Sequence, residues 1–153
     1  MEEAMERVPG FLYIDHIAVS VKAGELEAQV NAYKTMGFTE VHREEVPGGD
    51  QVREVLLQIG DGPNLIQLLE PLTAESPVAR QMEKNGGRGG LAHVAFRVVD
   101  IGRAFDYLKQ NGFQVVDAAP RRGSRGTTVF FVHPKTTEIA AFGYLFEVVQ
   151  AGM

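Results

Sequence analysis

The chain contains two stretches that resemble each other, and this internal repeat restricts the possible folds more than any other feature. Each stretch begins with an apolar segment around a histidine, continues with a Gly-Phe pair, and ends with an apolar segment around an oxygen-bearing side chain. Aligning the two stretches places His16 on His93 and Gln67 on Glu147. A duplicated module can bring its copies together about a pseudo-two-fold axis, so that two imidazoles, an amide and a carboxylate meet. That donor set suits a divalent metal ion.

The hydrophobic pattern predicts that each copy folds in the order β-α-β-β-β. In the first copy it predicts strands at 11–21, 38–45, 51–59 and 65–69, and a helix at 25–36. In the second copy it predicts strands at 91–99, 113–119, 127–132 and 143–149. Gly37 is expected to end the first helix as a C-terminal cap, and the second is expected to begin after Asp100 and end at Gly112.

The repeat predicts an α+β protein in which two tandem βαβββ modules form one curved mixed sheet around a central metal site. A length of 153 residues suits a single compact domain. We therefore expect a flexible leader and then one domain made of two modules and a connecting segment that holds a helix, begun by Ser76-Pro77, and a Gly-rich linker. The expected boundaries are 1–10 for the leader, 11–150 for the domain, 11–72 and 91–150 for the modules, and 73–90 for the connection.

Charge and composition exclude several classes of partner. The net charge of −5 provides no general attraction to nucleic acid or to an anionic membrane, and no apolar run reaches the roughly 20 residues that span a bilayer. The chain contains no cysteine, which excludes a thiolate metal site. Residues 1–7 are acidic and lack the apolar core of a signal peptide, so a cytoplasmic location is expected.

The four aligned polar residues interrupt strands that are otherwise apolar. Side chains alternate across a strand, so His16 shares its face with Ile14 and Ala18. Burying an unpartnered polar group costs a few kcal/mol, and a bound metal ion removes that cost. Nitrogen donors together with hard oxygen donors favour Co, Ni, Mn, Zn or Fe over Cu(I).

Other candidate ligands fit less well with the repeat. His42 falls in an expected edge strand and His133 precedes Pro134 in an expected turn, so we interpret both as structural. Glu70 is a rival to Gln67, but it lies at a strand end with the opposite parity.

Glu54 lies in the middle of an expected strand, on the face of Val52 and Leu56. One interpretation is a solvated strand face. If Glu54 instead faces the cavity, the site has a second carboxylate beside the metal. A metal flanked by two carboxylates suits proton abstraction and return at a carbon next to a carbonyl, because the metal stabilises charge on the enolate oxygen.

Residues 120–126 form the only dense basic cluster in the sequence, with three arginines within five positions among glycines. Arginine side chains in such a cluster can hold phosphates or carboxylates. The alternative is an exposed loop whose charges contribute only to solubility.

Six motifs together resemble those of the methylmalonyl-CoA epimerase family. They are Ile14-Asp15-His16-Ile17, Val52-Arg53-Glu54, Leu68-Leu69-Glu70-Pro71, His93-Val94-Ala95-Phe96, Pro120-Arg121-Arg122-Gly123-Ser124 and His133-Pro134-Lys135. The family belongs to the vicinal oxygen chelate superfamily, which also contains glyoxalase I and the extradiol dioxygenases. The resemblance extends from about Tyr13 to Gln150, nearly the whole chain.

This resemblance implies a cofactor, a reaction and an assembly. It implies a divalent metal, commonly Co²⁺, with Ni²⁺, Mn²⁺ or Zn²⁺ as alternatives, held by His16, Gln67, His93 and Glu147. It implies Glu54 and Glu147 as the acid–base pair that epimerises an acyl-CoA, (2R)/(2S)-methylmalonyl-CoA, at C2 in propionate metabolism. It also implies a homodimer, and Arg121, Arg122 and Ser124 as substrate-binding residues.

The chain departs from the family pattern in the segment 135–146, which is longer than usual. Glu138 in that segment is a weaker rival to Glu147, and the longer loop leaves ethylmalonyl-CoA open as a substrate. Three other functions remain open: a glyoxalase I acting on a glutathione hemithioacetal, a ring-cleaving dioxygenase, and a non-enzymatic antibiotic-binding protein.

Overall fold

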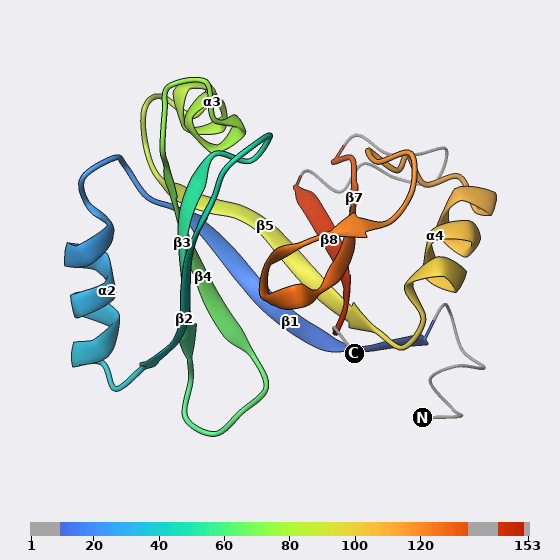
Figure 1. Ribbon diagram of the computed structural model, residues 1–153, viewed down its shortest axis with the longest axis horizontal. Helices are drawn as coiled ribbons and strands as arrows, with labels where there is room; N and C mark the ends of the chain where they lie inside the picture. Colours follow the sequence, from blue (N-terminus) through green and yellow to red (C-terminus); the bar gives the residue numbers. More distant parts are fainter. Residues whose placement is uncertain (1–9, 135–143, 152–153) are drawn as a thin grey trace. The chain divides into compact units, whose positions relative to one another are not determined.

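Strands and helices follow one another along the chain in the order that the repeat predicts (Figure 1). The computed structural model describes residues 10–134 and 144–151. The chain divides into a first unit, residues 16–92, and a second unit made of the described parts of 1–15 and 93–153. Of the helices in these described residues, none has both the length and the apolar character needed to cross a bilayer.

The first unit is a mixed four-stranded sheet with two helices. It contains the part of β1 (Phe11–Ser20) from His16 onward, followed by α2 (Leu26–Thr35), β2 (Thr39–Val46), β3 (Val52–Gln58), β4 (Leu65–Pro71) and α3 (Pro77–Lys84). The strand order is β2-β3-β4-β1, in which β1 and β4 are parallel and the other pairs antiparallel. The βαβββ order and the edge position of β2 are as predicted.

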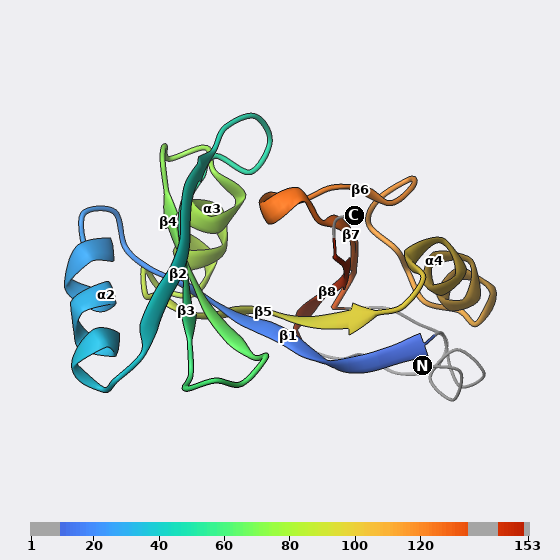
Figure 2. The ribbon, with the colours of Figure 1, turned by 60° about the horizontal axis from the view of Figure 1, so that its bottom comes forward.

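The two helices of the first unit cover opposite faces of its sheet (Figure 2). Leu26 and Val30 of α2 pack against Val55, Leu57 and Leu68 on one face. The other face carries a smaller apolar cluster of Ala18, Val52 and Leu69, against which Val78 of α3 packs. Because residues alternate between faces, His16, Ala18 and Ser20 of β1 share this second face.

Helix boundaries in both units agree with the predicted capping residues. Ser76 accepts a hydrogen bond from the N–H of Val78 at the start of α3, and Asp100 accepts one from the N–H of Arg103 in the second unit. Gly37 follows α2 with a φ of 99°, a left-handed conformation that glycine adopts without strain.

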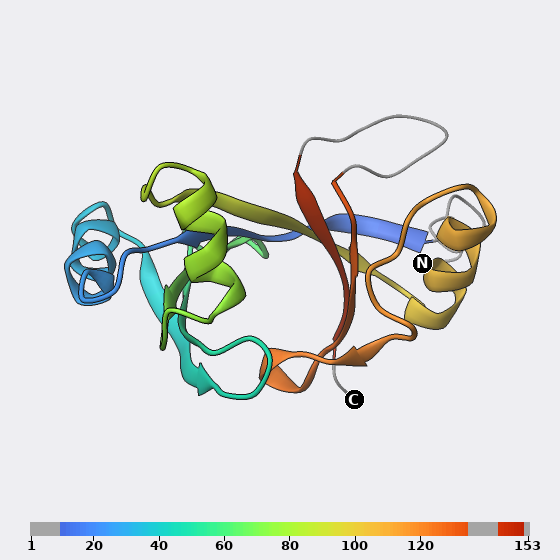
Figure 3. The same ribbon diagram turned by 90° about the horizontal axis from the view of Figure 1, so that it is seen from above.

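The second unit contains the start of β1 and the part of β5 (Gly90–Val98) from His93 onward. Its other elements are α4 (Ile101–Gln110), β6 (Arg121–Arg122), the 3-10 turn η2 (Ser124–Gly126), β7 (Thr128–Val132) and β8 (Leu145–Gln150). Its strand order is β5-β8-β7-β6, with β5 and β8 parallel. Figure 3 shows α4 on one side of β7 and β8. Phe105 of α4 meets Phe130 of β7 edge-on, with 5.2 Å between ring centroids, within the core of this unit.

The predicted strand at 113–119 is wrong. That segment makes an isolated bridge between Val115 and Val132, and regular pairing with β7 begins only at Arg121. The reason is a side chain that takes the place of the backbone: the Asp117 carboxylate accepts the N–H of Phe131 at 2.8 Å. Pro120 then has no N–H to donate to a ladder, so pairing resumes after it.

Candidate functional site

The two histidine strands and the two strands beside them pair in the same register in both units. In the first unit His16 is opposite Leu65 and Ala18 is opposite Gln67, between the parallel strands β1 and β4. In the second unit His93 is opposite Leu145 and Ala95 is opposite Glu147, between β5 and β8. Each unit therefore carries a histidine and an oxygen donor on one face of two neighbouring strands, as the sequence repeat predicts.

All four of these side chains are buried, with exposed fractions of 2% for His16 and between 7% and 8% for the other three. In the second unit His93 Nε2 lies 3.3 Å from a carboxylate oxygen of Glu147. The ring of Phe131, which is opposite Glu147 on β7, meets the His93 ring edge-on at 5.3 Å. Aromatic packing thus fixes the plane of the imidazole.

Gln67 and Glu54 are hydrogen-bonded to each other in the first unit. The Gln67 amide donates from Nε2 to Glu54 Oε2 at 3.1 Å, so Glu54 faces the same side of the sheet as Gln67 rather than solvent, with an exposed fraction of 2%. Gln67 Oε1 is buried and makes no hydrogen bond among the described residues. An orphaned buried acceptor costs about 1–3 kcal/mol, which a metal ion bound to that oxygen would remove.

Two polar residues of β2 lie on the Glu54 face of the first sheet. Glu44 is directly opposite Glu54 in the antiparallel pair, and His42 Nε2 is 2.6 Å from Glu44 Oε1. One ligand-type atom from each of the three residues lies within 4.8 Å of the others. The sequence interpretation of His42 as a structural residue overlooked this contact, because edge position alone does not identify which face a side chain occupies.

The second unit has no carboxylate at the position that corresponds to Glu54. In the first unit Gln67 is opposite Leu56, which lies two residues after Glu54. In the second unit Glu147 is opposite Phe131, which lies two residues after Val129, so Val129 corresponds to Glu54. Val129 is buried. The two units therefore differ at this position of the strand pairing.

The arginine cluster separates into residues with different environments. Arg121 is opposite Val129, its guanidinium lies 5.4 Å from the centre of the Phe131 ring, and its Nε donates to Asp117 at 2.9 Å. Arg121 therefore lies one aromatic ring away from His93. Arg122, the next residue of β6, has the opposite parity and is exposed. Ser124 begins the turn η2 and is half-buried.

Known proteins resemble this chain over most of its length. Residues 15–131 match the family described as the Glyoxalase/Bleomycin resistance protein/Dioxygenase superfamily. The chain belongs to this superfamily. The prediction of a vicinal oxygen chelate fold is thereby confirmed.

Relatives within the superfamily are named as epimerases. The Ethylmalonyl-CoA/methylmalonyl-CoA epimerase of Cereibacter sphaeroides is 35% identical over 80% of this chain and 88% of its own. The methylmalonyl-CoA epimerase structure from Mycobacterium tuberculosis has a TM-score of 0.81 and 30% identity, covering 92% of this chain and 89% of that one. A variant of the Streptomyces coelicolor enzyme in complex with 2-nitronate-propionyl-CoA has a TM-score of 0.81 and 33% identity, covering 94% and 99%. The chain therefore belongs to the methylmalonyl-CoA epimerase family, whose members are isomerases.

Arg125, the third arginine of the basic cluster, forms an ion pair that the sequence analysis did not predict. Arg125 donates from Nη2 to Asp15 Oδ2 at 2.8 Å, and Arg97 of β5 donates to Asp15 Oδ1 from two nitrogens at 2.6 and 3.0 Å. Asp15 is only 1% exposed. This buried carboxylate, next to His16 in the chain, connects the turn η2 to β5 within the second unit.

Glu70, the rival ligand, anchors a helix. Its Oε2 accepts the backbone N–H groups of Gly24 and Leu26 at 2.8 and 3.2 Å, at the start of α2, and its Oε1 accepts from Arg53 at 2.8 Å. The opposite parity assigned from sequence explains this, because Glu70 and Gln67 face opposite sides of β4. His133 follows β7 and pairs its backbone N–H with Gln114. Glu138 lies outside the described residues.

Proposed function

We propose that the protein epimerises (2R)- and (2S)-methylmalonyl-CoA at C2. The observation that carries this proposal is the hydrogen bond between Glu54 and Gln67, which gives the repeat-derived donor set an additional buried carboxylate on the same face. The names of the relatives and of the solved structures support the substrate class, since all three reported above are named for methylmalonyl-CoA and one of them is in complex with 2-nitronate-propionyl-CoA.

We propose His16, Gln67, His93 and Glu147 as the ligands of a divalent metal ion. The donor chemistry fits, because two imidazoles, a carbonyl oxygen and a carboxylate suit Co²⁺, Ni²⁺, Mn²⁺ or Zn²⁺. The orphaned Oε1 of Gln67 supports this assignment independently of the repeat. The family resemblance favours Co²⁺ among these ions. A bound divalent ion supplies a Lewis acid that stabilises negative charge on a substrate oxygen.

In the proposed reaction Glu54 and Glu147 move the C2 proton. One carboxylate removes the proton from one face of C2, and the other returns a proton to the opposite face. The Gln67 amide orients Glu54 by donating to its Oε2, and the same amide presents its oxygen away from that bond. Phe131 holds the His93 ring, and Glu147 is held within 3.3 Å of that ring. Arg121, Arg122 and Ser124 are proposed to contact the substrate, and Arg121 is best placed because it lies over Phe131.

The location, assembly, domain organisation and metabolic role of the protein are part of the same proposal. We propose a cytoplasmic homodimer that acts in propionate metabolism, organised as a leader at 1–10 and one domain at 11–150. Acceptance of ethylmalonyl-CoA is a second substrate proposal, supported by the relative from Cereibacter sphaeroides that is named for both thioesters.

The deciding experiment follows the C2 proton of methylmalonyl-CoA in deuterated water by NMR. We expect exchange of that proton with epimer equilibration, loss of both after chelation, and recovery after Co²⁺ is added. Exchange of neither epimer by the metal-loaded protein would refute the proposed function. Parallel assays with methylglyoxal plus glutathione and with a catechol test the glyoxalase and dioxygenase alternatives.

The metal assignment is tested separately from turnover. His93→Ala should weaken Co²⁺ affinity at least tenfold in equilibrium dialysis, while His133→Ala, outside the proposed ligand set, should leave it unchanged. Equal metal content in both variants would contradict the ligand assignment, and a wild-type protein that takes up no metal would favour an antibiotic-binding function.

A further inference from the structure

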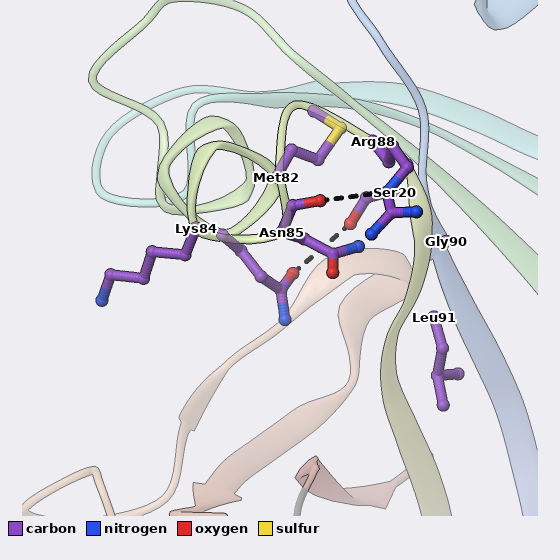
Figure 4. Close-up of a pocket in the computed structure, with 9 residues that line it drawn as sticks. Ser20, Met82, Lys84, Asn85, Arg88, Gly90 and Leu91 are labelled. Carbon is purple, nitrogen blue, oxygen red and sulfur yellow. Dashed lines mark hydrogen bonds between the residues drawn. The ribbon is translucent and has the colours of Figure 1, made fainter.

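A pocket of about 260 Å³ lies at the C-terminal end of α3 in the first unit (Figure 4). Its walls come from this helix end, from the glycine-rich segment that follows, and from Ser20 and Leu91, at the end of β1 and near the start of β5. None of the catalytic or metal-binding residues proposed above lines it, so it requires a separate explanation.

The charge of the pocket favours an anion. Of its nine lining residues, Lys84 and Arg88 are basic and none is acidic, in a chain whose net charge is −5. In Figure 4 Lys84 extends away from Arg88, which leaves the Arg88 guanidinium as the main cationic group of the pocket. Arg88 Nε donates to the backbone oxygen of Asn85 at 3.3 Å, which holds the guanidinium near the Asn85 amide.

Backbone carbonyls at a helix C-terminus ordinarily repel anions. Here the carbonyls of Gln81, Met82 and Glu83 accept hydrogen bonds from the N–H groups of residues 85–87, in the manner of a C-terminal cap. The carbonyl of Asn85 accepts from Arg88. Four backbone oxygens at this helix end, those of Gln81, Met82, Glu83 and Asn85, are therefore already hydrogen-bonded, which weakens their repulsion of an anion.

The glycine-rich segment forms a fixed wall of this pocket. A Cβ on Gly89 would lie 2.4 Å from the backbone oxygen of Ser20, so only glycine lets the segment approach β1 this closely. Ser20 donates its hydroxyl to Gln81 at 3.4 Å, and the Gln81 amide donates to the Ala92 oxygen at 3.2 Å. These contacts connect β1, α3 and β5 around the pocket.

The pocket lies along the strand that carries a proposed metal ligand. Ser20 is four residues beyond His16 in β1, on the same face of the strand, which corresponds to about 13 Å. Leu91, which also lines the pocket, is 58% exposed and lies two residues before His93 in β5. Both strands that carry the proposed histidine ligands thus contribute to the pocket.

We propose that this pocket binds the diphosphate of the coenzyme A thioester, with Arg88 as the principal contact. The inference rests on the proposed function, because the substrate must carry a pantetheine arm. Between its sulfur and its first phosphorus, that arm has about as many chain atoms as the backbone of four amino-acid residues. Fully extended, it therefore reaches roughly 14 Å. Its length matches the separation along β1 between His16 and Ser20.

The test compares two thioesters that differ only beyond the pantetheine arm. Arg88→Gln should raise KM for methylmalonyl-CoA about tenfold, with kcat little changed, and Arg88→Glu should raise it further. Neither change should affect KM for methylmalonyl-pantetheine, which lacks the diphosphate. Arg80→Gln and Arg80→Glu are matched controls, since Arg80 is an exposed arginine of α3 outside the pocket lining.

Calorimetric binding of coenzyme A itself separates the two proposals, because it does not require turnover. Arg88→Glu should weaken that binding and Arg80→Glu should not. Wild-type exchange of the C2 proton together with unchanged coenzyme A binding in Arg88→Glu would overturn the pocket assignment alone. A wild-type protein that neither exchanges the proton nor binds coenzyme A would overturn the proposed function, and the pocket assignment with it.

Discussion

Glu54 and Glu70 are buried carboxylates of the first unit that lie close together across the β3–β4 pair but face opposite sides of its sheet. Arg53 is opposite Glu70, and Glu54 is opposite Leu69. Replacing each carboxylate by the amide of the same size should therefore produce opposite outcomes. We expect Glu54→Gln to lose turnover and keep stability, and Glu70→Gln to keep turnover and lose stability.

The two magnitudes follow from the contacts of each carboxylate. Glu54→Gln removes a general base, which contributes typically 10²–10⁴-fold, or about 3–5 kcal/mol of the reaction barrier. The new amide still has an oxygen to accept the Gln67 hydrogen bond, so we expect unfolding free energy to change by less than about 1 kcal/mol. Glu70→Gln leaves only one acceptor oxygen for Gly24, Leu26 and Arg53, at a cost of about 2 kcal/mol.

Three measurements check this pair of variants: deuterium exchange at C2 of methylmalonyl-CoA, bound Co²⁺ per chain, and urea-induced unfolding of the metal-free protein. Co²⁺ content should equal that of the wild type in both. Wild-type exchange by Glu54→Gln would remove Glu54 from the mechanism. An equal loss of exchange in Glu70→Gln, with Co²⁺ still bound, would contradict the assignment of the two faces.

Three further substitutions test the structure around the site. Asp15→Asn should lower the unfolding free energy by about 3 kcal/mol in urea titrations, because it removes the buried charge that Arg97 and Arg125 share; an unchanged midpoint would contradict this. Gly89→Ala should cost about 1–3 kcal/mol by the same assay, since its Cβ would overlap the Ser20 oxygen, whereas Gly49→Ala, in open space, should be nearly neutral. Arg43 hydrogen-bonds Glu27 and Glu40 and lowers the pKa of both carboxyls, so the stability it contributes is present above pH 4.5 and is lost as pH falls through their lowered values. Arg43→Gln should therefore cost up to about 1 kcal/mol at pH 7 and less as the pH falls below 4.5, and a cost that does not change with pH would refute that linkage.

Most of the fold could be predicted because its determinants are local. The hydrophobic pattern identifies β3 and the apolar stripe of α2, and Ser76, Asp100 and Gly37 mark helix ends. The strand expected at 113–119 failed because the deciding contact is not local: the Asp117 carboxylate takes the N–H of Phe131, fourteen residues away in the sequence. A pattern of apolar residues carries no information about that competition.

Among the candidate site residues, too, local relations could be predicted from the sequence and long-range relations could not. Parity was enough to separate Glu70 from Gln67, since both lie on one strand. The alternation of side chains along one strand could not relate Glu54 to Gln67, because that relation requires the register between β3 and β4. It also could not reveal that Arg125 of the basic cluster pairs with Asp15, which is far away in the sequence. The roles of the four proposed ligands and of the two bases remain predictions until metal binding and exchange are measured.

The shared register of the two units, and their difference at the Glu54 position, suggest how metal binding and proton transfer are divided. Each unit holds a histidine and an oxygen donor across a parallel strand pair, and these two side chains are all that each unit contributes to the proposed metal site. The antiparallel neighbour then differs: it supplies Glu54 in the first unit and Val129 in the second. A carboxylate in both positions would place one more negative charge in the buried interior of its unit, where a charge is costly unless it is paired. If Glu147 is both ligand and base, as proposed above, a single additional carboxylate in the first unit is enough for a reaction that needs one base for each face of C2.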